Sequence, residues 1–297
     1  MYLIKTEAKA IYRHTNAWSR GTLGILVRTW QSFVETNAAE AAASIAYYAL
    51  FSFFPLLILL VGFASSILID IEVKETVLNF IAESLPTAQD LVKYNIERAL
   101  AVQGTAKLAG TIGLLWAATG VFTALAHNIN RAWHTARKRN FFFGRLIGLA
   151  MVATLAGLLI AWLVVTTAIN LFPLLEVPLF NGKAIYETYL WSLLSRLLPA
   201  VFLFLAVINL YRWTPNTKVR WREAIVGATV STLGMELTTR LFSWYLTSGM
   251  ARYQIIYGSL GAVVALLLWI YLSSLIVLFG AHLSAAIAFE TRLKGKE

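Results

Sequence analysis

The stretch Leu155-Ala-Gly-Leu-Leu-Ile-Ala-Trp-Leu-Val-Val165 decides the fold, because it lies inside residues 146–172, which contain no charged side chain. The hydrocarbon core of a bilayer is about 30 Å thick, and a helix needs roughly 20 apolar residues to cross it. The length of the segment and its lack of strict alternation favour a transmembrane helix over a barrel strand. The bilayer is therefore the expected solvent for much of this chain.

The composition of the whole chain points the same way. Hydrophobic residues make up 59% of the 297 residues and charged residues 13%, about half the charged share of a typical soluble protein. The absence of cysteine excludes disulfide scaffolds, thiolate catalysis and cysteine-ligated metals. The sequence also lacks a phosphate loop, a dinucleotide-binding glycine motif and a nucleophile elbow. We therefore expect no cofactor, no ATP-driven pump and no familiar hydrolase.

Six apolar stretches have the length of a membrane span, and we predict an all-α, polytopic membrane protein that forms one domain over residues 1–297. Residues 22–35 place apolar side chains on one helical face, which predicts an interfacial helix before the first span. The segment after the first span, up to residue 107, predicts two short amphipathic helices broken near Pro86. The predicted spans are 45–69, 108–126, 146–172, 189–211, 224–246 and 260–283.

The distribution of basic residues predicts the orientation of the spans. One alternate set of connecting segments, which includes both termini, holds 17 of the 25 Lys and Arg residues, and the other set holds 6. Loops rich in Lys and Arg stay in the cytoplasm, so both termini are expected inside a bacterial inner membrane. The net charge of +10 then reflects this cytoplasmic face, with membrane lipids as partners and no nucleic acid.

Three charged residues fall inside predicted spans, namely Arg196, Glu236 and Arg240. Each costs on the order of 3 kcal/mol there, so each needs a partner or a function. Glu236 and Arg240 stand at i and i+4, where an ion pair can close on itself. Arg196 and Arg240 lie at similar depth on consecutive spans, and one acid against two arginines makes a net positive site for an anion such as a lipid phosphate. A structural ion pair and a snorkelling arginine are the alternatives.

The first span carries a polar stripe that ends near Pro55, which is expected to kink the helix. Glu40, Tyr48 and Pro55 are candidates for a cavity or gate on this stripe. The alternative is a helix–helix seam in which small and hydroxyl residues let backbones approach, and Gly227 and Ser231 form a similar small pair on the fifth span. The stripe consists of Asn37, Glu40, Ser44, Tyr48 and Ser52.

Two histidines, His127 and His282, fall near the predicted cytoplasmic ends of their spans. We interpret both as interfacial residues that hydrogen-bond a headgroup or a carbonyl. Neither shows the spacing of a metal-binding helix motif, so no metal site is expected.

Several motifs follow one another in a fixed order along the chain. They are Ala42-Ala-Ser-Ile-Ala-Tyr-Tyr-Ala-Leu-Phe-Ser-Phe-Phe-Pro-Leu-Leu57, Asn128-Ile-Asn-Arg-Ala-Trp133, Val219-Arg-Trp-Arg-Glu-Ala-Ile-Val-Gly-Ala228, Tyr253-Gln-Ile-Ile-Tyr-Gly-Ser-Leu260, Trp269-Ile-Tyr271 and Leu278-Phe-Gly-Ala281. Over roughly residues 25–290 the sequence resembles the BrkB/YihY family of bacterial inner-membrane proteins. The resemblance implies six spans, and it links the chain to envelope maintenance, serum resistance and the transport of lipids or lipopolysaccharide precursors.

The same family also carries the label ribonuclease BN. The predicted cytoplasmic loops contain no cluster of acids or histidines for metal-dependent RNA hydrolysis, so we expect no enzymatic activity. After Gly280-Ala281 the family often has a glutamate, where this chain has His282. The role of that position is therefore open in this chain.

The leading hypothesis is a non-enzymatic membrane protein that binds or moves an anionic or amphipathic envelope molecule such as a lipid. Arg196, Glu236 and Arg240 are its predicted ligand-binding residues. The alternative is a scaffold that moves nothing and docks envelope proteins, and a ribonuclease comes third.

Overall fold

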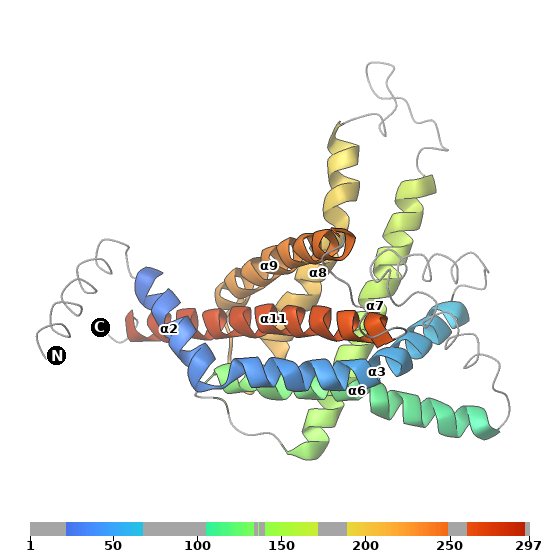
Figure 1. The fold of residues 1–297 in the computed structure, drawn as a ribbon, viewed down its shortest axis with the longest axis horizontal. Coiled ribbons are helices and arrows are strands. Elements are labelled where there is room, and N and C mark those ends of the chain that lie inside the picture. Colours follow the sequence, from blue (N-terminus) through green and yellow to red (C-terminus); the bar gives the residue numbers. More distant parts are fainter. Residues whose placement is uncertain are drawn as a thin grey trace, which may run out of the picture.

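The computed structural model describes residues 22–67, 105–133, 136, 140–171, 189–248 and 260–294. This part of the chain is helical and contains no strand (Figure 1), which confirms the predicted all-α class for these residues. The predicted short helices around Pro86 lie outside the described residues. The helices are α2 (Thr22–Glu35), α3 (Ala38–Ile67), α6 (Thr105–Ala132), α7 (Phe141–Leu171), α8 (Tyr189–Trp213), α9 (Trp221–Thr247) and α11 (Gly261–Lys294).

Each of the six predicted spans falls largely on one of these helices, because long apolar runs can satisfy their backbone groups only within a helix in lipid. Three described segments are long and apolar enough to cross a membrane: Ile112–Ala132, Phe142–Thr167 and Val263–Arg292. A shorter apolar segment, Leu197–Trp213, lies in α8. The number of six spans and their orientation stay predictions.

The centre of the fold is a layer in which α3, α6 and α11 run side by side (Figure 1). The helix α9 packs against α11, and α2 lies across the end of α11 at the start of α3. By contrast, α7 and α8 run across the direction of this layer (Figure 1). The core is rich in alanine, which lets helix backbones approach closely; its alanines include Ala38, Ala41, Ala42, Ala224, Ala228 and Ala281.

Ser52 lies at the contact between α3 and α6 and forms a hydrogen bond across it. Its hydroxyl donates to the Ala117 carbonyl at 2.7 Å, and a Cβ at Gly120 would lie 2.9 Å from the Ser52 oxygen. The rest of the polar stripe on α3 is exposed, including Ser44 and Tyr48. A step of four residues turns a helix by about 40° more than a full turn, so the stripe drifts around α3 and only Ser52 reaches the seam with α6.

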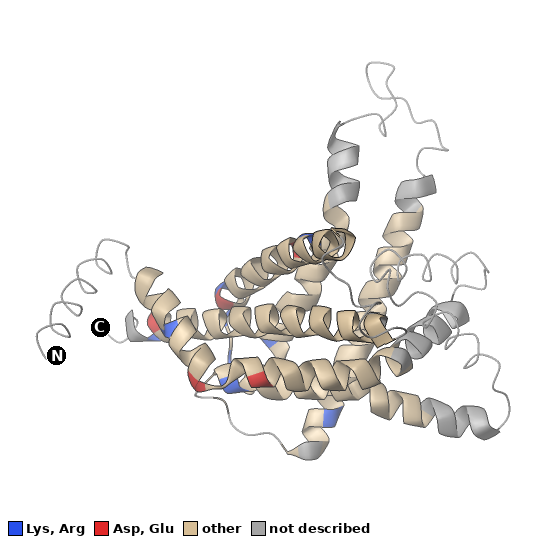
Figure 2. Cartoon of the chain, viewed as in Figure 1, with Lys and Arg blue, Asp and Glu red and all other residues tan. Residues whose placement is uncertain are grey.

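Hydrogen bonds hold together the ends of segments that are far apart in sequence. Arg131 at the end of α6 donates to the Thr36 carbonyl at 3.0 Å. The Asn216 amide donates to the Asn130 side chain at 2.7 Å, and Arg292 near the end of α11 donates to the Lys218 carbonyl at 3.1 Å. Most of the charged residues in Figure 2 gather toward this same end of the molecule. The segments joined here are ones that the distribution of basic residues assigns to one side of the membrane.

The helix α2 has the bounds predicted from the sequence, and the face that it turns to the protein is mixed, because the partly buried Phe33 lies there beside two buried polar residues. Thr29 and Ser32 are its buried residues and face the protein. Trp30 is 60% exposed, and its neighbours on the outer face are also apolar. The outer face of α2 is therefore the face available to lipid; it comprises Leu23, Leu26, Trp30 and Val34.

Candidate functional site

The intramembrane acid and base predicted on the fifth span lie on α9 and form an ion pair. The Nε and Nη2 atoms of Arg240 donate to Oε1 of Glu236 at 2.9 Å and 2.7 Å. The side chain of Arg240 is 75% exposed and that of Glu236 is 49% exposed. The pair has the i, i+4 geometry expected from the sequence, and it lies on the outside of the helix.

The ion pair interrupts an apolar surface. Leu233 lies three residues before Glu236, and Leu237 lies one residue after it. Both leucine side chains are exposed. Leu241 and Trp244 continue the same face beyond Arg240 and are also exposed. We call this surface the α9 outer face; it comprises Leu233, Glu236, Leu237, Arg240, Leu241 and Trp244.

The other predicted site residues do not join this pair in the described structure. Arg196 lies on α8, but its side chain is outside the described residues. Glu40 and Tyr48 are exposed on α3. Pro55 lies half-buried inside α3, a helix that bends along its course (Figure 1). The structure therefore pairs Glu236 with Arg240 alone, and the site of Arg196, Glu236 and Arg240 stays a prediction.

A tight seam joins α8, α9 and α11. The hydroxyl of Tyr211 donates to the Val277 carbonyl at 2.6 Å and shares a hydrogen bond with Ser231 at 2.7 Å. A Cβ placed on Gly227 would lie 2.6 Å from the Gly280 carbonyl. Both glycines are therefore needed for the close approach of α9 and α11. The predicted small-residue pair Gly227 and Ser231 accordingly lies at a helix contact.

The corner where α2 meets α11 contains a buried histidine that the sequence interpretation placed at the membrane interface. His282 is 2% exposed. Its Nδ1 atom lies 2.9 Å from the Ser32 hydroxyl, and its Nε2 atom lies 3.1 Å from the Thr36 hydroxyl. Phe33 packs edge-on against the imidazole ring, with 5.7 Å between centroids. The interfacial interpretation of His282 was wrong because three residues of the α2 end, far away in sequence, cover it; His127, in contrast, is exposed.

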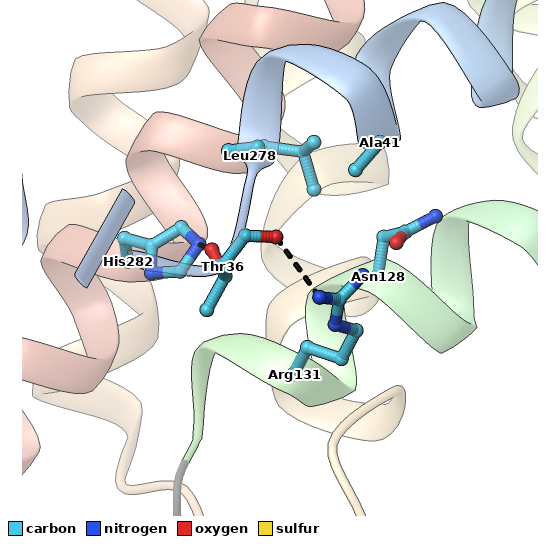
Figure 3. A pocket seen from close by; sticks show the side chains of 7 residues that line it. Thr36, Ala41, Asn128, Arg131, Leu278 and His282 are labelled. Carbon is cyan, nitrogen blue, oxygen red and sulfur yellow. Dashed lines mark hydrogen bonds between the residues drawn. The ribbon is translucent and has the colours of Figure 1, made fainter. Parts of the chain in front are cut away.

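A pocket lies beside this corner, between the α2–α3 turn and the end of α6 (Figure 3). Asn37 makes the turn with φ of 52°, a left-handed conformation that asparagine tolerates better than most residues. The turn brings Thr36 over α6, where Arg131 bonds to its carbonyl. We call this the corner pocket; it is lined by Thr36, Ala38, Ala41, Asn128, Arg131, Leu278 and His282.

A further arginine, Arg145, lies near the start of α7 and of its apolar segment Phe142–Thr167. It was assigned to the connection between the second and third spans, and its position relative to the membrane stays a prediction. Its Nη1 atom donates to the Thr119 hydroxyl at 2.8 Å, and its guanidinium lies 4.3 Å from the ring of Trp116. The neighbouring Gly148 offered a signal for this helix crossing, since a Cβ there would lie 2.9 Å from the Thr123 hydroxyl.

No group of three or more His, Cys, Asp or Glu side chains among the described residues could hold a metal ion.

Helices that are long and apolar enough to cross a bilayer, joined by polar contacts at one end, define a helical membrane protein. The chain belongs to the BrkB family, because the family described as "Virulence factor BrkB" matches residues 29–297. The family resemblance stated from the motifs is thereby confirmed.

Curated relatives are similarly named membrane proteins. A UPF0761 membrane protein of Alteromonas mediterranea is 30% identical over 289 residues, which cover 96% of this chain and 95% of the relative. A UPF0761 membrane protein of Vibrio cholerae, strain M66-2, is 32% identical over 264 residues, with 89% and 85% covered. One of Vibrio vulnificus, strain YJ016, is 31% identical over 247 residues, with 83% and 76% covered. No solved structure matches the chain significantly.

Proposed function

We propose that this BrkB-family protein crosses the bacterial inner membrane six times, with both termini in the cytoplasm. The excess of Lys and Arg in alternate connecting segments supports this orientation. The hydrogen bonds that bring Thr36, Asn130 and Lys218 to one end of the molecule agree with it.

In the same proposal, the protein binds or moves an anionic or amphipathic envelope molecule such as a lipid, and it catalyses no reaction. The observation that carries this proposal is the ion pair of Glu236 and Arg240 on the otherwise apolar α9 outer face. Charged side chains inside spans normally face a bundle interior or a water-filled cavity, because acyl chains cannot solvate them. A molecule with a polar group and an apolar body fits the α9 outer face, since its polar group meets the pair and its body lies along Leu237 and Leu241.

The sequence adds Arg196 to this site. It lies on α8, which contacts α9, and it gives the site a second cation. With one acid and two arginines the site carries a net positive charge, so an anionic group is the preferred polar partner.

The test uses the purified full-length protein in proteoliposomes with a fluorescent anionic lipid. We expect saturable flux or binding in the parent and its loss in Arg196→Ala and Arg240→Ala. Arg222→Ala is the matched control, because Arg222 is an exposed arginine in the first turn of the same helix α9. Variants that handle the lipid as well as the parent would refute the assignment of these residues.

One observation favours the alternative function of a scaffold that docks envelope proteins. Arg240 directs two donors to Glu236, so the pair is neutral as a unit. If the parent protein shows neither transport nor saturable lipid binding in the same experiment, the scaffold is the better description.

A further inference from the structure

The two sides of α9 are built from different kinds of residue. The side that packs on the protein has small buried residues at its centre, namely Gly227, Ala228, Ser231 and Thr232. The outward side carries large apolar side chains that are exposed, namely Val226, Val230, Leu233, Leu237 and Trp244. We propose that this outward side is the contact surface between two copies of the chain. The inference goes beyond the proposed function and does not rest on it.

The spacing of the exposed residues on α9 is that of a helix–helix contact. From Val226 to Trp244 they follow one another in alternating steps of four and three residues, with Arg240 as the charged member of the series. A mean step of 3.5 residues keeps one stripe facing a partner helix along its length, whereas contact with acyl chains requires no such spacing. We call this stripe the α9 seam; it comprises Val226, Val230, Leu233, Leu237, Arg240 and Trp244.

The ion pair on this side of α9 has hydrogen-bonding atoms to spare. Both donors that Arg240 directs to Glu236, Nε and Nη2, bond to the same oxygen, Oε1. The carboxylate oxygen Oε2 and the guanidinium nitrogen Nη1 take no part in these two bonds, so the pair keeps an acceptor and a donor for a further partner. A lipid phosphate supplies acceptors for the arginine but no donor for the carboxylate. A second copy of the pair supplies both.

Two-fold symmetry brings two such pairs together. An interface about a two-fold axis joins the same surface of both copies, so this surface must be complementary to itself. The outward side of α9 meets this condition, because its acid and its base lie one helical turn apart. The Nη1 atom of each copy can then donate to Oε2 of the other, and the four charges sum to zero. Hydrogen bonds between helices hold helices together in a membrane, where apolar burial alone does not.

The direction of the two helices follows from the proposed topology. Every copy then has the same orientation in the membrane, so the two-fold axis runs along the membrane normal and the two α9 helices run in the same direction. Trp244 lies 18 residues after Val226, about 27 Å along the helix at 1.5 Å per residue. The outward side is open to lipid in a single copy and covered in the dimer, so this inference and the proposed function concern two states of one surface.

Disulfide crosslinking of the full-length protein in native membranes tests the inference. The chain is suited to it because it has no cysteine of its own. Leu233→Cys places one thiol in the α9 seam, where it forms a disulfide only with a second copy whose Cα atom lies within about 7 Å. We expect mild oxidation to convert most of this variant into a linked dimer.

Thr239→Cys is the matched control for random collisions. Thr239 is exposed on the same helix, but it lies about 120° around the helix from Leu233 at 3.6 residues per turn. It should give about tenfold less linked dimer, which corresponds to about 1.4 kcal/mol. Equal crosslinking of the two variants would overturn the inference.

A second experiment tests the charges across the contact. In the Leu233→Cys background, Glu236→Arg leaves two bases on the outward side of α9 and Arg240→Glu leaves two acids. Each of these variants alone should lose the linked dimer about tenfold, because like charges meet across the two-fold axis. Expressed together with different tags, they should form a linked dimer that contains one copy of each.

Failure of the two charge variants to form this mixed dimer would overturn the inference as well. The comparison of Leu233→Cys with Thr239→Cys uses neither charge variant, so it decides the matter even if one of them fails to fold. Lipid flux is measured separately on the parent. A missing crosslink with normal flux refutes this inference alone, and a normal crosslink without flux refutes the proposed function alone.

Discussion

Around α11, two buried polar side chains, Tyr211 on α8 and His282 on α11, bond to neighbouring segments, whereas on the α9 outer face two charges are exposed and bond to each other. Tyr211 and His282 represent the first region, with hydrogen bonds to two neighbours each. Glu236 and Arg240 represent the second. Both regions place polar groups in a chain whose composition is mostly apolar.

The difference separates two uses of a polar residue in a membrane protein. A buried polar group with several partners fixes helix positions, and removing it leaves those partners unsatisfied. An ion pair between two residues of one helix joins no separate helices and contributes only about 0.5 kcal/mol or less. Its presence on an apolar face therefore needs another reason, and ligand binding is the reason proposed for the α9 outer face. The comparison predicts large stability effects along α11 and small ones on α9.

The largest effect is expected at Gly280. In Gly280→Val the new side chain would collide with the Ser231 hydroxyl and lie within 2.9 Å of the Gly227 carbonyl. We expect a loss of about 3 kcal/mol in the free energy of unfolding, measured by chemical denaturation in detergent. Gly157→Val on α7 is the control, since a Cβ there meets no atom within 4 Å; equal destabilisation of both variants would contradict the tight seam.

The next effect is expected at His282. His282→Leu replaces the imidazole by an apolar side chain of similar size and leaves the hydroxyls of Ser32 and Thr36 without their shared partner. A loss of about 2 kcal/mol is expected, in the range for unsatisfied buried groups. The exposed His127 provides the matched substitution, His127→Leu. The thermal unfolding midpoint of His282→Leu should lie clearly below that of His127→Leu. Equal midpoints would contradict a structural role of the buried His282.

A smaller effect is expected at Tyr211. Tyr211→Phe removes the hydroxyl that bonds to the Val277 carbonyl and to Ser231 while keeping the ring. The free energy of unfolding should fall by about 1–2 kcal/mol. Tyr48→Phe removes the hydroxyl of an exposed tyrosine and should change it by much less. Thermal unfolding of both variants under one condition checks the comparison.

The smallest stability effect is expected at Glu236. Glu236→Gln breaks the ion pair with Arg240, but both side chains are largely exposed. Since the pair lies within one helix and joins no separate helices, the free energy of unfolding should change by less than about 1 kcal/mol. A loss as large as that of His282→Leu would show that the pair is structural, and the contrast between the two regions would disappear.

The positions of the helices could be predicted from sequence because apolar run length depends only on neighbouring residues. The bounds of α2 and the i, i+4 pairing of Glu236 with Arg240 are local features of this kind. The small residues Gly227 and Ser231 also indicated a close helix contact, which the structure shows between α9 and α11.

The packing of the helices and the surroundings of the buried polar residues depend on contacts between segments that are distant in sequence. Ser32 and His282 are 250 residues apart, and no periodicity connects them. The apolar face of α2 was visible in the sequence, but the packing of its polar face against α11 depends on His282 supplying partners for Ser32 and Thr36. The contacts of Arg145 with Trp116 and Thr119 could not be predicted either, because these residues are 29 and 26 positions away on another helix. The corner pocket follows from the same long-range contacts and has no sequence signal of its own.

The most direct test of the contrast measures lipid flux and the unfolding midpoint together in Arg240→Ala and Tyr211→Phe. Flux is measured with the fluorescent anionic lipid in proteoliposomes and is expressed per folded protein. Arg240→Ala is predicted to lose most of the flux with an unchanged midpoint, and Tyr211→Phe is predicted to keep the flux with a lowered midpoint. The contrast between the two regions would be contradicted if Arg240→Ala kept the flux of the parent. It would also be contradicted if the unfolding midpoint of Arg240→Ala fell as far as that of Tyr211→Phe.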